Sequence, residues 1–391
     1  MFNKNKDELE KLGATITTQE IYQQPELWGE TLQNYINQKE QIEAYLNYIQ
    51  EKHKKIRVIF SGAGTSAFVG ETVEAYLNEK NERSKWLFEE IPTTSIVASP
   101  NTYLDYDTPT ILVSFARSGN SPESIATVEL ANKMIKDIYH ITITCAEDGT
   151  LASRARDEDN NLLLLQPKKS NDQGFAMTGS YTCMTLTSLL VFDTASLEEK
   201  AQFVLNIKKM AKYLLNNERK IQDIIDLQCD RVIYLGANAL LGVAHEAQLK
   251  ILELTAGKIA TMYETPVGFR HGPKSFVNND SVVVVFGSND SHTRKYDEDL
   301  VNEIYQDKIA KKVILLSAIQ ENNVSADTFT FAADYQGIPD VYLALPYIMF
   351  GQTLGLMAAV TVGNLPDTPS PTGTVNRVVQ GVVIHDMSFD S

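Results

Sequence analysis

Cysteine is scarce in this sequence, and basic residues form no cluster. The 391 residues include three scattered cysteines, Cys145, Cys183 and Cys229, without a CxxC pair or a Cys/His cluster. A disulfide framework and a zinc site are therefore not expected, and this usage fits a reducing cytoplasm. The formal net charge is −15, which argues against a nucleic acid or an anionic membrane as partner. An anionic ligand would have to be bound by backbone amides or by one or two side chains.

Long apolar runs are not evident either. We expect no membrane-spanning helix, because none of the apolar runs approaches roughly 18 residues. The N-terminus, MFNKNKDELEKLGA, lacks the apolar core of a signal peptide. Hydrophobic residues make up 43% and charged residues 22% of the chain, as is typical of soluble globular proteins. We therefore expect a cytoplasmic protein, long enough for two domains with a full core each.

What the sequence does contain is an internal repeat. Residues 58–77 and 232–252 each show an apolar run, a turn of small residues and a helical pattern. A glutamate follows the first glycine of each turn by nine or ten residues, at Glu71 and Glu246. Residues 109–124 and 281–296 also resemble each other, because each is an apolar strand pattern followed by a Ser/Gly/Asn loop and a helical pattern. The repeat predicts two similar α/β units whose polar loops lie at the carboxyl ends of their strands, where open parallel sheets bind ligands.

Strand patterns alternate with helical patterns through both units, which predicts an α/β protein with two doubly wound parallel sheets. We expect an N-terminal helical arm at 1–50, a first domain at 51–196, a connecting helix at 197–228 and a second domain at 229–391. The expected strands are residues 56–62, 85–91, 109–115, 138–145 and 161–167 in the first domain and 231–237, 258–264, 281–287, 312–317 and 328–333 in the second.

Two loops of the first unit, at 61–66 and 116–124, have the composition of a phosphate site. Glycines expose backbone N–H groups there, and the helix N-termini that follow add partial positive charge. Either loop alone also suits an ordinary helix cap, but two in one unit favour a phosphomonoester. A dinucleotide or P-loop site is not expected, because neither GxGxxG nor Gly-Lys-Ser/Thr is present. The side chains that can bind the phosphate are Thr65, Ser66, Arg117, Ser118 and Ser121.

The corresponding part of the second unit carries charged residues instead. Glu246, Lys250 and Glu253 are spaced so that they share one helix face. The spacing alone is typical of a solvated salt-bridge face, whereas the apolar flanks favour a face directed into a cleft. Further along, His271 lies in a Gly-Pro turn after a strand and suits proton transfer near neutral pH. Glu264 stays open as an alternative acid–base group.

These motifs resemble the sugar isomerase (SIS) domain family, in its double-domain form. FSGAGTS, SFARSGNSPES, EAQLKILE and RHGP follow one another as in that family, and the resemblance covers roughly 50–385. ETPVGFRHGPKS and PSPTGTVNRVVQG resemble the galactosamine-6-phosphate deaminase subgroup, also called tagatose-6-phosphate ketose/aldose isomerase. The resemblance implies flavodoxin-like three-layer αβα domains, a phosphorylated hexose or hexosamine substrate, and a homodimer or larger homo-oligomer with shared sites. It implies neither a metal nor a cofactor.

The resemblance also implies roles for individual residues. Glu253 corresponds to the base that moves a proton between C1 and C2, with Lys250 and Glu246 as supporting charges. His271 corresponds to the ring-opening histidine, which in that family comes from the neighbouring subunit. Ser66, Arg117, Ser118 and Ser121 correspond to phosphate-loop positions. Gln380 stands where the related glucosamine-6-phosphate synthase has a lysine. Possible lid or substrate contacts are Thr178, Arg377 and Gln380.

The expected reaction is the conversion of galactosamine 6-phosphate to tagatose 6-phosphate and ammonia. An aldose–ketose isomerisation without ammonia release is the alternative within the same class. A sugar-phosphate-sensing regulator is the alternative from another class, which residues 1–55 do not favour because they lack a basic face for DNA.

Overall fold

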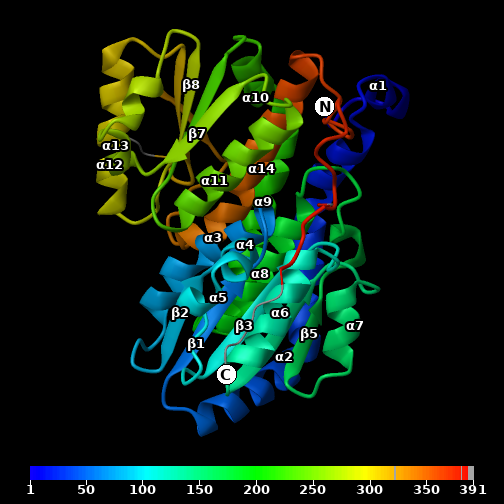
Figure 1. Ribbon diagram of the computed structural model, residues 1–391. Helices are drawn as coiled ribbons and strands as arrows, with labels where there is room; N and C mark the ends of the chain where they lie inside the picture. The colour runs from blue at the N-terminus through cyan, green and yellow to red at the C-terminus, as the bar shows by residue number, and fades with distance from the viewer. Residues whose placement is uncertain (321–322, 380, 386–391) are drawn as a thin grey trace.

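The computed structural model describes residues 1–320, 323–379 and 381–385. Two lobes each contain a five-stranded parallel sheet, and both sheets have the same strand order: β2-β1-β3-β4-β5 and β7-β6-β8-β9-β10 (Figure 1). This is the flavodoxin-like order. The strands are β1 (Ile56–Ser61), β2 (Trp86–Glu90), β3 (Thr110–Ala116), β4 (Ile138–Thr144), β5 (Asn161–Leu165), β6 (Arg231–Leu235), β7 (Ala260–Glu264), β8 (Ser281–Phe286), β9 (Lys312–Ser317) and β10 (Asp327–Thr330). The predicted α/β class with two parallel sheets is confirmed.

Helices alternate with these strands and cover the sheets. They are α1 (Lys6–Lys11), α2 (Thr15–Lys52), α3 (Thr65–Lys80), α4 (Thr93–Ala98), α5 (Pro100–Tyr103), α6 (Pro122–Met134), α7 (Thr150–Arg156), α8 (Gly179–Phe192), α9 (Leu197–Asn216), α10 (Glu218–Ile225), α11 (Ala239–Leu254), α12 (Pro266–Phe269), α13 (Thr293–Asp307) and α14 (Asp340–Thr361), with short 3₁₀ turns η1 (Lys168–Ser170) and η2 (Pro273–Phe276). The expected single helix at 197–228 is wrong, because the helix is interrupted at Asn217, which separates α9 from α10. The Asn217 side chain donates to the Tyr213 carbonyl, 2.8 Å away, which ends α9.

The N-terminal helix α2 is part of the core. It packs on α8 and α9, and Ile21 and Trp28 are fully buried. The indole of Trp28 donates to the Thr182 hydroxyl at 3.0 Å, so the one polar atom of this ring also has a partner. Helix α2 therefore holds its position by apolar burial along its length, and its N-terminal turns reach the first sheet's loops.

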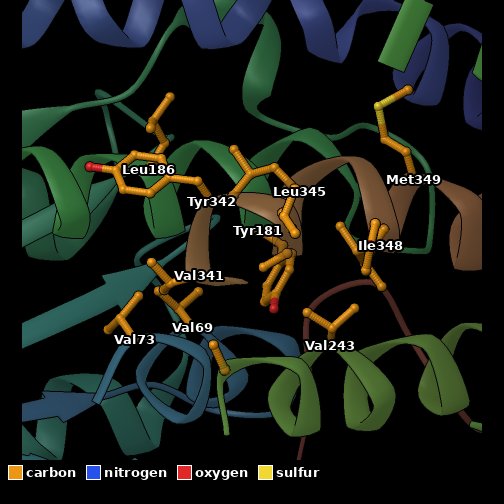
Figure 2. Close-up of a cluster of buried hydrophobic side chains, with 14 of the residues drawn as sticks. Val69, Val73, Tyr181, Leu186, Val243, Val341, Tyr342, Leu345, Ile348 and Met349 are labelled. Atoms are coloured by element: carbon orange, nitrogen blue, oxygen red, sulfur yellow. The ribbon is translucent and has the colours of Figure 1, made fainter. Parts of the chain in front are cut away.

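Helix α14 lies at the centre of the molecule. Its residues pack between α3, α8 and α11, so that one hydrophobic cluster spans both lobes (Figure 2). By length and composition α14 could cross a membrane, which corrects the expectation that no run is long enough, but 94% of its apolar window is buried inside the protein. We therefore describe α14 as a core helix. The residues labelled in Figure 2 are Val69, Val73, Tyr181, Leu186, Val243, Val341, Tyr342, Leu345, Ile348 and Met349.

The turns that begin α3 and α11 have the same backbone geometry. Gly64 precedes α3 with φ 56° and ψ −129°, and Asn238 precedes α11 with φ 51° and ψ −124°. Glycine adopts this positive-φ backbone without strain, whereas for a residue with a Cβ such as Asn238 it is uncommon. Counted from the turns, the residue equivalent to Glu71 is His245 rather than Glu246. The two equivalent residues meet where α3 packs on α11, with His245 Nδ1 2.8 Å from Glu71 Oε2.

Candidate active site

A cavity of about 200 Å³ lies at the carboxyl ends of β1 and β3. It lies where the N-termini of α3 and α6 approach each other, so that two helix dipoles point toward one space. Many of the predicted site residues line it, together with apolar residues from a loop before α8. The predicted residues that line the cavity are Thr65, Ser66, Arg117, Ser118, Ser121, Glu253 and Arg377.

The turn before α3 depends on glycine. A Cβ on Gly62 would lie 2.5 Å from the backbone carbon of Ser66, and Gly64 has the positive φ given above. These two glycines let the chain enter α3 tightly enough to present Thr65 and Ser66 at the cavity. Both hydroxyl residues are nearly buried. A helix N-terminus with hydroxyl groups is a site suited to an anion.

Arg117 supplies positive charge at the cavity from the end of β3. It is 7% exposed, and its Nη1 donates to the carbonyls of Phe175, 3.2 Å away, and of Gly174 at 3.5 Å. Its Nη2 donates to the carbonyl of Arg377. Burial, and then the charge of Arg377, lower the pKa of Arg117 from its ordinary value. A guanidinium nevertheless stays protonated in proteins, so Arg117 brings a fixed cation to the cavity.

Three charged residues of α11 reach across from the second lobe. Glu246 and Lys250 are fully buried, and Glu253 lines the cavity. Lys250 Nζ lies 2.6 Å from Glu253 Oε2, 3.2 Å from Glu246 Oε1 and 3.2 Å from Thr65 Oγ1. The interpretation as a solvated salt-bridge face is therefore wrong, and α11 joins the two lobes at the cavity.

Burial and pairing set the charges of this group. Burial raises the pKa of Glu246 to about 7, against the opposing effect of Lys250. Burial alone would lower the pKa of Lys250, but Glu246 and Glu253 outweigh it and raise this pKa above the ordinary value. Lys250 is therefore a stable ammonium beside the Glu253 carboxylate.

Comparisons with known proteins agree with this geometry. Residues 52–192 match the SIS domain family. The D-galactosamine-6-phosphate deaminase AgaS of Escherichia coli O157:H7 is 40% identical over 374 residues, which cover 95% of this chain and 96% of that protein. The chain belongs to the AgaS family. The AgaS deaminase of Shewanella sp. (strain ANA-3) is also 40% identical, over 383 residues that cover 97% of this chain and 94% of that one.

Two solved structures resemble this chain over nearly its whole length. The crystal structure of tagatose-6-phosphate ketose/aldose isomerase from Escherichia coli superimposes with a TM-score of 0.84 at 36% identity, covering 95% of this chain and 96% of the other. A Clostridium novyi NT protein, named provisionally as the same isomerase, gives a TM-score of 0.92 at 42% identity and covers 99% of each chain. The membership that the motifs indicated is confirmed.

Several predicted residues of this AgaS-family chain lie elsewhere. His271 is exposed in the turn after α12, and Glu264 accepts from the Thr265 amide at 2.7 Å; neither lines the cavity. Thr178 is buried with its hydroxyl 2.8 Å from Asp172 Oδ1, so it does not face the cavity either. Gln380 lies outside the described residues. Within the residues that the structure describes, no group of three His, Cys, Asp or Glu side chains is arranged to hold a metal ion.

Two further segments form part of the cavity wall. One was not predicted, and the other was predicted only as a possible lid. The loop before α8 contributes Phe175 and Met177, which carry no motif. The C-terminal segment runs from the end of α14 back over the first lobe, where residues 375–379 line the cavity (Figure 1). Arg377 fixes this segment through Nε, which donates to the Asp172 carbonyl at 2.9 Å. The wall is thus assembled from distant parts of the chain, since Arg377 and Asp172 are separated by 205 positions.

The loop of the second lobe that corresponds to 116–120 is closed by the protein's own carboxylates. The Asn289 amide donates to Asp340 Oδ1 at 2.6 Å, and the Ser288 hydroxyl donates to the other oxygen of Asp340. The Ser288 amide donates to Asp297 Oδ2 at 2.9 Å. Burial raises the pKa of Asp297 to about 7 and that of Asp340 above its ordinary value. Donors that would suit an external anion are therefore already satisfied in the second lobe.

Proposed function

We propose that this chain is a cytoplasmic D-galactosamine-6-phosphate deaminase, which forms D-tagatose 6-phosphate and ammonia. The observation that carries the proposal is the contact of Glu253 with the buried Lys250 beside the anion-binding helix N-termini. It places a carboxyl group at one wall of the cavity, with a buried ammonium directly behind it, opposite a wall that suits a phosphate. The names of the AgaS relatives, which match over nearly the whole chain, support the choice of amino sugar.

The proposed binding follows from the two helix N-termini. Ser66, Ser118 and Ser121 would donate to the phosphate oxygens, with Thr65 nearby and Arg117 neutralising charge. Because phosphate contacts are remote from the reacting carbons, they serve to fix C1 and C2 of the open-chain sugar against Glu253. Arg377 would close the cavity from the C-terminal segment.

The proposed chemistry is a proton transfer followed by hydrolysis. The Glu253 carboxylate takes the proton from C2 of the open-chain amino aldose and returns it to C1, which gives a ketimine at C2. Lys250 stabilises the negative charge that develops on the C1 oxygen. Water then adds to the ketimine, and ammonia leaves as the ketose phosphate forms. His271 of a second copy would assist ring opening, in an oligomer with shared sites.

An ammonia-release assay tests this function. Galactosamine 6-phosphate, glucosamine 6-phosphate and their N-acetylated forms are compared, and we expect ammonia from galactosamine 6-phosphate. Glu253→Gln should lower kcat by about 10²–10⁴-fold while binding persists. Glu79→Gln is the matched control, because Glu79 is the exposed residue at the equivalent position of α3.

A plain tagatose-6-phosphate ketose/aldose isomerase is the second candidate, favoured by the names of the solved relatives. Background ammonia together with interconversion of unaminated hexose phosphates would establish it. A DNA-binding regulator is not favoured, because α2 is packed into the core. Specific DNA binding in a gel-shift experiment would contradict both enzymatic proposals.

A further inference from the structure

Glu20 has a buried carboxyl group that lies behind the cavity wall. It is on α2 and is 6% exposed. Its Oε1 accepts hydrogen bonds from the backbone amides of Gln173 and, at 3.2 Å, Gly174. Oε2 lies 3.3 Å from the Gly174 amide as well. Glu20 therefore binds the inner side of the loop before α8 without lining the cavity itself.

The opposite side of the same loop faces the proposed phosphate site. Arg117 donates to the carbonyls of Gly174 and Phe175, and Phe175 lines the cavity. The peptide groups at 173–175 are thus held from both sides, with N–H groups toward Glu20 and C=O groups toward Arg117. A shift of this loop would move both an aromatic part of the wall and the acceptors that orient the guanidinium.

The surroundings of Glu20 disfavour the ionised form of its side chain. Burial, and then the charge of Asp172, raise the pKa of Glu20 to about 8, while the two loop amides and Arg117 act in the other direction. A buried ionisable group held by backbone amides next to a cavity is a candidate for a functional role.

We infer that Glu20 is a positioning residue for substrate binding: by holding the 173–175 loop it fixes Arg117 and Phe175 in the geometry that receives the sugar phosphate. This inference rests on the proposed phosphosugar site. It makes the N-terminal helix, which carries no motif of the family, part of the binding machinery.

Glu20→Leu removes the acceptor and retains an apolar side chain of similar length. We expect the KM for galactosamine 6-phosphate and the Kd for inorganic phosphate, measured by calorimetry, to rise about tenfold, because the hydrogen bonds from the loop amides to the Glu20 carboxyl oxygens are lost. The expected kcat stays within about twofold, since Glu253 and Lys250 are untouched. Glu20→Gln should restore both constants to within about twofold, because its amide oxygen still accepts the loop N–H groups. Glu30→Gln, an exposed site on the same helix, should leave both unchanged.

A second variant tests the contact from the loop. A Cβ on Gly174 would lie 2.9 Å from Glu20 Oε2, so Gly174→Ala should push the Glu20 side chain and the loop apart and raise the same two constants. Unchanged constants in Glu20→Leu, or a loss of kcat and thermal stability with unchanged KM and Kd, would overturn the inference. The phosphate measurement needs no turnover. A wild type that binds phosphate but releases no ammonia would therefore overturn the proposed reaction and still leave the role of Glu20 decided by the variants.

Discussion

At the scale of single residues, Lys250 supplies the positive charge that compensates the carboxyl groups of α11. Its Nζ contacts Glu246, Glu253 and Thr65. Removing one partner of a buried ion pair leaves the other charge without compensation. We expect Lys250→Met to lower the free energy of unfolding by about 3–5 kcal/mol, measured by urea denaturation.

The double variant Lys250→Met/Glu246→Leu is the informative control. It removes the carboxylate that the single variant leaves buried, and we expect it to recover much of the lost stability. Lys80→Met breaks the exposed contact with Glu79 and should change stability by less than about 1 kcal/mol. A double variant as unstable as the single one would show that Lys250 does not act by compensating Glu246.

At the scale of elements, the N-terminus of α14 closes the loop of the second lobe. Asp340→Ala would leave the buried donors of Ser288 and Asn289 without an acceptor, and we expect a loss of about 1–3 kcal/mol in the free energy of unfolding. Because the freed donors suit an anion, millimolar phosphate should restore part of this loss and leave the wild type less affected. Thermal unfolding with and without phosphate measures both effects.

Asp290→Ala is the control for that prediction. Asp290 caps α13 by accepting from the amides of His292 and Thr293, so its loss should also destabilise the protein. In the part of the chain that the structure describes, Asp290 accepts no hydrogen bond from Ser288 or Asn289, and phosphate should therefore not restore the stability of Asp290→Ala. Equal rescue of both variants would contradict the interpretation of Asp340 as an internal anion.

The strands could be predicted from the sequence because parallel strands buried on both faces are continuous apolar runs. β8 shows this in SVVVVF, every residue of which is buried. The charged face of α11 could be predicted from spacing, and its apolar flanks favoured a cleft, but the complete burial of Lys250 could not be predicted. That burial depends on the contact of Lys250 with Thr65, which the chain separates by 185 positions.

The 173–175 loop could not be predicted for a similar reason. Its residues match no motif, and its place is set by Glu20 on one side and Arg117 on the other. The break at Asn217 was missed because the apolar periodicity continues through it, whereas a single side-chain hydrogen bond ends α9. Local patterns therefore identified the elements and seven residues that line the cavity, while contacts between distant segments decided which other side chains lie there.

At the scale of the whole molecule, buried acids make stability depend on pH. Burial raises the pKa of Glu20 to about 8 and those of Glu90 and Asp297 to about 7. Each folded value lies above the unfolded one, so the folded chain binds more protons, and the free energy of unfolding should fall as pH rises from about 5 to 8. His140 acts oppositely, since burial lowers its pKa from 6.5 to about 4 and favours folding as pH rises through that range.

The decrease should therefore be clearest between about pH 7 and 8, where the titration of His140 in the unfolded state, centred at 6.5, is largely complete. Urea denaturation at several pH values in that window measures it. Glu20→Gln should flatten the upper part of the curve, since it removes the group with the highest of these raised values. A free energy of unfolding that rises over the same window would contradict the protonation of these buried acids.

The exposed position of His271 gives a prediction about the assembled protein. His271 does not line the cavity of its own chain, so it can serve the proposed reaction only from another copy. His271→Ala and Glu253→Gln should each be inactive as homo-oligomers. After subunit exchange in a dimer, half of the molecules would be mixed, and each mixed dimer would contain one site with both native residues. Recovered activity should then approach roughly one quarter of the wild-type value. Ammonia release from the mixture, compared with each variant alone, measures this recovery. Because a histidine acting within its own chain would leave no native site in a mixed dimer, a mixture without activity despite demonstrated exchange would contradict the shared site.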